Sequence, residues 1–500
     1  MDILLVLPII IPFTLAIISI LSWGQRQLQR FLALTGTVSL LIVALTLLLS
    51  VQQNGIQTTY IGSWPAPFGI VIVADLLSAI MVVMASIIGL AVVVYSFASM
   101  DREREHFGYY PLILILLMGM CGAFLTGDIF NLYVWFEIML ISSFALLALG
   151  GERAQLEGSI KYFALNLLIS AFFLSGLGFL YSITGSLNMA DLAVRLPQVN
   201  QSGLVTVIAM FFLVAFGIKS AVYPMFFWLP ASYHTAPISV SAIFAGLLTK
   251  VGVYAMIRVF TLLFIGDVPF THELLLIIAG FTMVTGVLGA VSKNEIRRIL
   301  SFHIISQIGY MIMGLGLFTP LALAGSIFYI MHHIIVKTNL YLIGGIINRV
   351  AGSYELKNLG GLYKSHVGLA VLFLIPAFSL AGFPPLSGFW AKFTLIRAAL
   401  ESQQYIIALV ALAVGMLTVF SMTKIWAAAF WKDRAEDNAA PVAYLSRFEW
   451  RAYYLPVIAL ALLTICIGIL AEPVFQLATQ AAEQLSNPQI YIQAVLENSR

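Results

Sequence analysis

Residues 216–230 read Phe-Gly-Ile-Lys-Ser-Ala-Val-Tyr-Pro-Met-Phe-Phe-Trp-Leu-Pro. They place Lys219 within a long apolar segment, and an ionised side chain at the centre of a bilayer costs roughly 3 kcal/mol on insertion scales. Pro224 has no backbone N–H, so the carbonyl of Ser220 loses its helical partner and the helix should break. Membrane proteins build internal polar sites where broken helices adjoin ionisable residues. The stretch therefore predicts an interrupted spanning helix that carries a proton or ion site.

The composition indicates that similar segments fill the chain. Of its 500 residues, 61% are hydrophobic and 9% are charged, whereas a soluble domain carries about 25% charged residues. A spanning helix needs about 20 mostly apolar residues. We therefore predict an all-α integral membrane protein with about fourteen spanning segments, near residues 3–22, 31–51, 75–98, 108–125, 129–149, 159–184, 204–229, 238–263, 272–291, 297–317, 321–348, 367–400, 404–431 and 452–471.

Three of these segments have features that affect whether they form one continuous spanning helix. The seventh contains Pro224 and Pro230 and should break. The twelfth contains Gly382-Phe-Pro384-Pro385 and is too long for one uninterrupted helix. The first follows Asp2 rather than basic residues and has no clear small-x-small cleavage site, so we interpret it as a spanning helix and not as a signal peptide. The polar tail after Glu472 is expected not to span.

The loops on the two sides differ in positive charge. One set of alternate loops holds sixteen of the 25 Lys and Arg residues, and the other set, with the termini, holds Arg195, Arg258, Arg397 and Arg500. The side rich in Lys and Arg is normally cytoplasmic. We therefore expect a multi-pass protein of a bacterial plasma membrane with both termini outside. The remaining cations are Lys424, expected to snorkel to the cytoplasmic side, and four interior lysines: Lys219, Lys250, Lys337 and Lys392.

Several function classes lack support in the sequence. Cys121 and Cys466 are too few for an iron–sulfur or zinc ligand set. No phosphate-binding loop and no strand-linked dinucleotide fingerprint occurs. We expect no cofactor, no resident metal and no nucleic-acid partner. Uphill ion movement would then need a gradient or a partner protein as its energy source.

An acidic residue lies inside the fifth segment. Glu137 is surrounded by Leu, Ile and Phe, and Asp128 opens the same helix, where a carboxylate suits the helix dipole. Burial favours the protonated form of a carboxyl group, whereas a nearby lysine favours the ionised form. Glu137 would then be able to change between its protonated and ionised forms, as a proton pathway requires. The alternative is that Glu137 only tethers two helices.

The interior lysines continue this pattern. Lys219 could exchange protons, or it could stay charged and only hold Glu137. Lys250 lies about thirteen residues into the eighth span and is the natural next carrier. Lys392 follows Pro384 in the twelfth segment, so a second helix break adjoins a lysine. Two such breaks suggest a structural repeat.

Histidines supply further titratable groups in the tenth and eleventh segments. His303 and Gln307 are four residues apart and share a helix face, as do His333 and Lys337. Histidine is suited to proton transfer because it titrates near physiological pH. A metal site would need further ligands. His303 is close to the cytoplasmic end and could only bridge waters, and we assign supporting roles to it and to the remaining members of this group: Gln307, His332 and Lys337.

These stretches together resemble the antiporter-like subunits shared by Mrp-type cation/proton antiporters and respiratory complex I. The resemblance rests on the Glu137 segment, Gly-Ile-Lys219-Ser-Ala…Pro224, Ser306-Gln-Ile-Gly-Tyr310, His333-x-x-x-Lys337 and Gly-Phe-Pro-Pro…Lys392. Within the family, Lys392 and the short chain beyond the last span favour the D-type Mrp protein over the M-type and L-type proteins of complex I and over the A-type Mrp protein. The N-type protein of complex I is harder to exclude.

The resemblance implies an architecture and a set of roles. It implies two inverted five-helix repeats, helices 4–8 and 9–13, and hence four parts: residues 1–107, 108–263, 272–431 and 432–500. It implies that Glu137 and Lys219 form a coupled pair, that Lys250 and His333 form a central relay, and that Lys392 is the terminal lysine. Other membrane subunits, of Mrp A, B, C, E, F and G type, would be the partners, with protons and Na⁺ as the transported ions.

Two other functions stay open. The same residues would serve a proton-pumping subunit of complex I or of a membrane-bound hydrogenase, with redox energy as the source. The chain could also be a structural scaffold, although the buried lysines speak against it. No carboxylate cluster marks a Na⁺ site, so the cation path could lie at an interface with a partner.

Overall fold

The computed structural model describes residues 3–433 and 445–497. Arg434 and Arg500 lie outside the described residues. The helices before the first break are α1 (Ile3–Leu21), α2 (Arg26–Asn54), α3 (Leu76–Ser99), α4 (Arg102–His106), α5 (Tyr109–Leu125), α6 (Ile129–Ala148), α7 (Arg153–Thr184), α8 (Met189–Arg195) and α9 (Ser202–Ser220). The helices from that break to the second are α10 (Trp228–Ser232), α11 (Ile238–Ile243), α12 (Thr249–Leu262), α13 (Val268–Ser292), α14 (Ile296–Leu317), α15 (Pro320–Ala351), α16 (Leu362–Ser365) and α17 (Val367–Ala381). Those that follow are α18 (Ser387–Glu401), α19 (Tyr405–Trp426), α20 (Arg447–Ile469), α21 (Ala471–Ser486) and α22 (Pro488–Leu496).

The predicted number of spans is confirmed. Among the described residues, 12 helices are long and apolar enough to cross a membrane, and α11 and α12 count as one of them because a π-helical turn, Phe244–Leu248, joins them. Two shorter apolar helices, α5 and α17, complete the set. Together they correspond to the fourteen predicted segments, with α17 and α18 as the two halves of the twelfth.

Both predicted breaks are present. The helix α9 ends at Ser220, Ala221 turns left-handed with φ 60°, and the short helix α10 follows after Pro224. In the twelfth segment α17 ends at Ala381, and Gly382 takes φ 98°, which glycine adopts without a steric penalty. Because the last carbonyls of a helix have no partner within it, each break leaves backbone acceptors inside the bundle.

A small hairpin, not predicted from the sequence, lies at one end. Strands β1 (Gln57–Tyr60) and β2 (Val71–Ala74) pair antiparallel, with Gln57 opposite Ala74. The Tyr60 hydroxyl donates to the Val495 carbonyl at 2.8 Å, so the hairpin is tied to α22.

The tail after Glu472 is more than a polar extension. It forms α21 and α22, and α21 packs against α15 and α3. Its buried positions are Ala478, Ala481, Ala482 and Leu485. This spacing of three, four and seven residues is that of one helix face, and small alanines let that face approach its neighbours closely. The tail is therefore part of the helix bundle.

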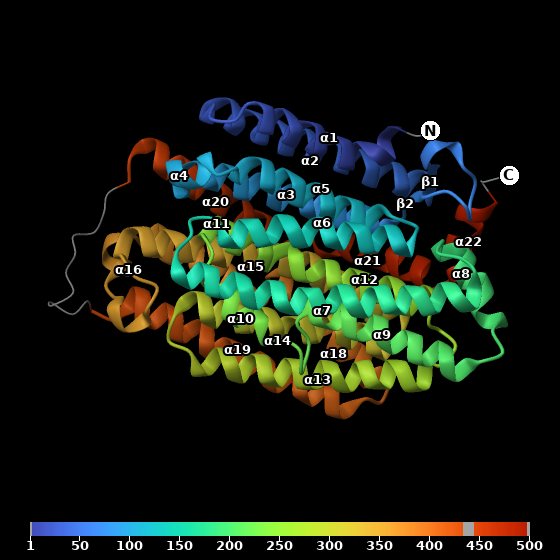
Figure 1. The fold of residues 1–500 in the computed structure, drawn as a ribbon. Coiled ribbons are helices and arrows are strands. Elements are labelled where there is room, and N and C mark those ends of the chain that lie inside the picture. The colour runs from blue at the N-terminus through green and yellow to red at the C-terminus, as the bar shows by residue number, and fades with distance from the viewer. Residues whose placement is uncertain (1–2, 434–444, 498–500) are drawn as a thin grey trace.

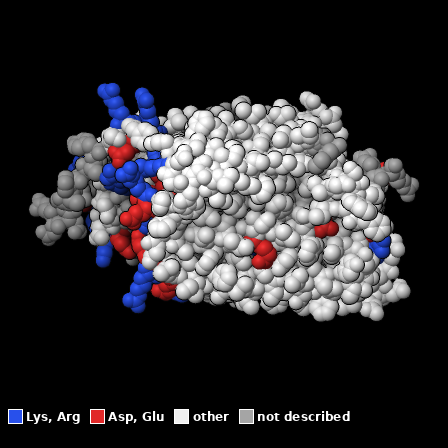
Figure 2. Space-filling view, turned by 45° about the horizontal axis from the view of Figure 1, so that its top comes forward, with Lys and Arg blue, Asp and Glu red and all other residues white. Residues whose placement is uncertain are grey.

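Charge separates the two ends of the molecule. The long helices lie side by side, with the hairpin, α8 and α22 at one end and α4 and α16 at the other (Figure 1). Figure 2 shows Lys and Arg gathered at the α4 end, whereas the visible flank is nearly free of charge. An uncharged flank with Lys and Arg gathered at one end is typical of a membrane-spanning bundle.

Candidate functional site

Glu137 and Lys219 line the same small void. Lys219 is 1% exposed, and its Nζ donates to Asn166 Oδ1 at 3.1 Å. Ser170 Oγ donates to a Glu137 carboxylate oxygen. Among the described residues the two ionisable groups form no direct ion pair; a void of about 10 Å³ lies between the side chains that surround them. Such a void holds about one water, so Asn166, Ser170 and a water would couple the pair.

The break after α9 holds Lys219 in place. The lysine lies in the last helical turn, where a cation interacts favourably with the carbonyl end of the helix dipole. Trp228 Nε1 donates to the carbonyl of Ile218 at 2.9 Å. This bond satisfies one carbonyl that the break leaves free, and it fixes α10 next to the lysine. The ring of Phe136 lies 5.7 Å from Lys219 Nζ.

Lys250 lies two residues after the π-helical turn. The side chain is fully buried, and its Nζ donates to the Ala245 carbonyl at 2.5 Å and to Thr249 Oγ1 at 3.3 Å. A π turn shifts the helical hydrogen-bond pattern and is often found at functional sites. Here it supplies a backbone acceptor to a lysine that has no carboxylate partner among the described residues.

The two adjacent histidines of α15 have different surroundings. His333 is fully buried, and neither ring nitrogen has a partner among the described residues. His332 Nδ1 instead lies 2.8 Å from Ser387 Oγ, at the start of α18. Buried polar atoms are nearly always hydrogen-bonded, to protein or to water. His332 Nε2 also has no partner among the described residues, but its Nδ1 contact joins α15 to the break in the twelfth segment.

The other predicted supporting residues are also buried. Lys337 Nζ donates to the Leu300 carbonyl at 3.3 Å, and His303 Nε2 lies 2.6 Å from Ser421 Oγ of α19. Gln307 accepts a hydrogen bond from the Tyr329 hydroxyl, and the Tyr329 ring lies 5.7 Å from that of His332. These contacts connect α14, α15 and α19 around the histidines.

Lys392 lies against the second break. Its Nζ donates to the Ala381 carbonyl at 3.2 Å and lies 4.9 Å from the ring centroid of Tyr310. Gly382 allows this approach, since a Cβ there would lie 3.0 Å from the lysine Cδ. Pro384 follows in the turn that frees the Ala381 carbonyl. The break therefore supplies the acceptor for Lys392, much as the π turn does for Lys250.

Two other predicted residues have structural contacts. Asp128 caps α6, with its carboxylate accepting from the Asn131 N–H at 2.7 Å. Lys424 donates to the Val291 and Lys293 carbonyls at 3.1 and 2.7 Å. A lysine that binds the last carbonyls of a helix stabilises its C-terminus, so Lys424 is anchored at the end of α13 and stands apart from the interior lysines.

One assignment from the sequence was wrong. Arg258 was counted among the loop charges, but it lies within α12, is 4% exposed and pairs with Asp75 at 2.6 Å. Asn166 and Ser170, the hydrogen-bond partners of Lys219 and Glu137, were not predicted from the sequence. They are four residues apart on α7, a spacing that could have indicated a polar stripe on an apolar helix.

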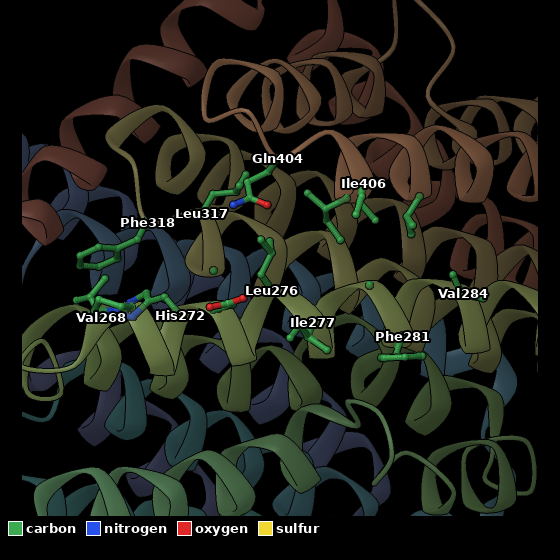
Figure 3. A pocket seen from close by; sticks show the side chains of 16 residues that line it. Val268, His272, Leu276, Ile277, Phe281, Val284, Leu317, Phe318, Gln404 and Ile406 are labelled. Atoms are coloured by element: carbon green, nitrogen blue, oxygen red, sulfur yellow. The ribbon is translucent and has the colours of Figure 1, made fainter. Parts of the chain in front are cut away.

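A hollow beside α13 lies away from these residues. Its volume is about 770 Å³, and its lining comes from α13 and from the ends of α14 and α19 (Figure 3). His272 and Gln404 lie near one end, and Phe281 and Val284 lie farther along α13. The interior lysines do not line this hollow.

The chain is similar to known transport proteins along most of its length. The family model described as "NADH:quinone oxidoreductase/Mrp antiporter, TM" matches residues 126–419. Over 497 residues the chain is 50% identical to the D subunit of the Na⁺/H⁺ antiporter of Alkalihalophilus pseudofirmus, covering 99% of this chain and 100% of that relative.

Solved structures show the same fold. A chain of the Mrp complex from Dietzia sp. DQ12-45-1b superposes with a TM-score of 0.92 at 31% identity, covering 99% of this chain and 100% of that chain. A chain of the membrane-bound sulfane sulfur reductase, an archaeal respiratory membrane complex, superposes with a TM-score of 0.90 at 26% identity and covers 99% of both chains.

Proposed function

Because the chain belongs to the NADH:quinone oxidoreductase/Mrp antiporter family, we propose that it is the D-type subunit of a multisubunit Na⁺/H⁺ antiporter. It would be a secondary transporter component and not an enzyme, acting with membrane subunits of Mrp A, B, C, E, F and G type. The observation that carries the proposal is the set of interior lysines, Lys219, Lys250, Lys337 and Lys392, all at most 6% exposed and none in a direct ion pair with a carboxylate among the described residues. Buried ionisable groups of this kind are typical of proton pathways.

The proposed proton route starts at the Glu137–Lys219 pair. A proton that binds Glu137 neutralises its carboxylate and weakens the electrostatic attraction between Glu137 and Lys219. Charge then shifts through Lys250 and His333 toward Lys392, with Lys337, His332, His303 and Gln307 as supporting groups. Cation exit would be coupled to this shift. Polar atoms without protein partners at His333 support a water-bridged step in the middle of the route.

The proposed orientation places both termini outside a bacterial plasma membrane. The hairpin and α22 lie at the end opposite the Lys- and Arg-rich loops (Figures 1 and 2). The positive-inside rule supports this assignment.

The test is replacement of Lys219 by alanine in the complete complex. Na⁺-driven proton movement in membrane vesicles should vanish, because the first pair loses its cation. Lys161→Ala is the matched control, since Lys161 is exposed and pairs with Glu157 on the surface of α7. Full exchange in the Lys219 variant would remove this residue from the route.

The likeness to a respiratory membrane complex favours one second candidate, a proton-pumping subunit that uses redox energy. The two candidates differ in their partners. Purification from native membranes should yield only membrane subunits for an antiporter, whereas co-purified iron–sulfur proteins would favour the redox-driven complex.

A further inference from the structure

A buried ion pair joins α12 to the start of α3. Arg258 Nη2 lies 2.6 Å from Asp75 Oδ2, and the two side chains are 5% and 3% exposed. The other oxygen of Asp75 accepts from the Ser78 N–H at 2.9 Å and caps α3. Burying both charges is expensive, and apolar residues of similar volume are often as stable. Asp75 can cap α3 without an arginine beside it. The cap therefore does not explain why Arg258 is buried next to Asp75.

The pair lies on the same helix face as a relay lysine. Lys250, Tyr254 and Arg258 follow one another at intervals of four residues, so they form a line along α12. Lys250 and Arg258 are eight residues apart, so their backbone positions are separated by about 12 Å along the helix axis. The Arg258 Nη2 donates to the Tyr254 hydroxyl at 3.3 Å, and that hydroxyl donates to the Phe124 carbonyl at 2.6 Å. Tyr254 and Arg258 are thus hydrogen-bonded, and Lys250, which donates to Ala245 and Thr249, lies one helical turn before Tyr254 in the same polar line of side chains.

The C-terminal helices cover the pair on its other side. The ring of Tyr491 of α22 lies 5.3 Å from the guanidinium carbon of Arg258. Gln484 of α21 accepts from the Leu76 N–H at 3.0 Å, next to Asp75. A void of about 10 Å³ remains between these groups, enough for about one water. The ion pair therefore terminates the polar line of α12 on the side of the bundle that carries α22.

We propose that Asp75 and Arg258 form the gate through which the relay exchanges protons at the α22 end of the protein. The inference rests on the proposed antiport function and extends it from the row of lysines to its connection with the solvent. Asp75 binds a proton on its carboxylate and becomes a neutral acid. The proton then passes by way of water and the Tyr254 hydroxyl, which gives up one proton as it receives another, to the neutral amine of Lys250. Arg258 keeps its charge throughout.

The two residues have different tasks in this gate. Asp75 is the group that carries the proton. Arg258 is a fixed cation in the polar line between Lys250 and the α22 end, and a fixed arginine opposes the free passage of protons and cations. Neutralising Arg258 should therefore change the proton leak, whereas neutralising Asp75 should change the rate of antiport.

The test uses the complete complex in proteoliposomes, with two measurements: Na⁺-driven proton movement, and proton leak under a pH gradient without Na⁺. Arg258→Met should raise the leak by about tenfold, because the cationic barrier is lost. Asp75→Asn should lower antiport by at least about tenfold without a leak, because the carrier is lost and a buried cation is left unpaired. Asparagine retains the cap on α3.

The double variant Asp75→Asn/Arg258→Met separates a gate from a structural pair. It removes both charges, so a purely structural pair would recover antiport, whereas a gate without its proton carrier stays at least about tenfold slower. Recovery of antiport in the double variant would overturn the proposal, and so would an unchanged proton leak in Arg258→Met. Arg397→Met, which removes an exposed pair with Glu401, is the matched control.

Charge-conserving variants and the unaltered complex are the remaining controls. If Asp75→Asn does not assemble, Asp75→Glu and Arg258→Lys retain the charges and should keep antiport with a wild-type leak; a large leak in either would contradict the gate. The unaltered complex must show Na⁺-driven proton movement. Its absence would refute the proposed function itself, whereas its presence with a recovered double variant would refute only the gate.

Discussion

Lys219 illustrates how a side chain in this protein depends on a partner from another helix. Its Nζ has Asn166 Oδ1 as acceptor, at 3.1 Å, and Asn166 is itself held by a bond from its Nδ2 to the Tyr162 carbonyl. The lysine could be recognised from its apolar neighbours in the sequence. Its acceptor could not, because an asparagine in an apolar helix has no signature that names its partner.

Asn166→Leu should slow antiport by about tenfold, because leucine has a similar size but leaves the ammonium without an acceptor, at a cost of about 1–3 kcal/mol. Initial rates of Na⁺-driven proton movement measure the effect. Asn54→Leu, at the exposed end of α2, is the control. Equal rates in the two variants would show that Asn166 has no part in the first step.

The adjacent histidines should respond differently to the same substitution. His332→Asn should keep most antiport, because an amide can still bond to Ser387. His333→Asn should abolish antiport, because a relay position needs a group that gains and loses a proton. Rates normalised to the amount of assembled complex provide the comparison, and similar losses at both positions would contradict the assignment of His333.

At the scale of elements, the break in the twelfth segment depends on close packing of α17, α18 and α15. A Cβ at Gly388 would lie 1.8 Å from the Ser379 carbonyl oxygen and 2.8 Å from His332 Cε1. Prolines in the sequence predicted the break, since proline in a helix interior removes a hydrogen bond and kinks or breaks the helix. The need for glycine at position 388 depends on another helix and was not predictable.

Gly388→Ala should destabilise the protein by about 1–3 kcal/mol or more, the usual cost of overpacking. Thermal unfolding of the purified complex in detergent would report the loss. Gly368→Ala is the control in α17, because a Cβ there meets nothing within 4 Å. Unchanged melting of the Gly388 variant would mean that the two halves can move apart freely.

At the scale of the whole molecule, the C-terminal helices complete the bundle. The sequence suggested a polar tail, because the composition of α21 is too polar for a span. Its apolar side is a stripe of small residues that packs on α15 and α3.

Ala478→Leu should therefore lower the amount of assembled complex and its melting temperature, because Ala478 is fully buried and a larger side chain costs about 1–3 kcal/mol. Gln480→Leu is the control, since Gln480 is exposed on the same helix. Wild-type melting of both variants would refute tight packing of α21.

The fourteen spans, the two breaks and the interior lysines follow from the sequence alone. Apolar length, proline and misplaced charge are properties of short stretches, and the bilayer acts on each stretch separately. The hydrogen-bond partners depend on how the helices pack. Lys219 and Asn166 are 53 residues apart, and Arg258 meets Asp75 at the start of α3 and Tyr491 of α22. Such contacts are fixed by the rotation of each helix about its axis and by its crossing with its neighbours, which no local pattern specifies.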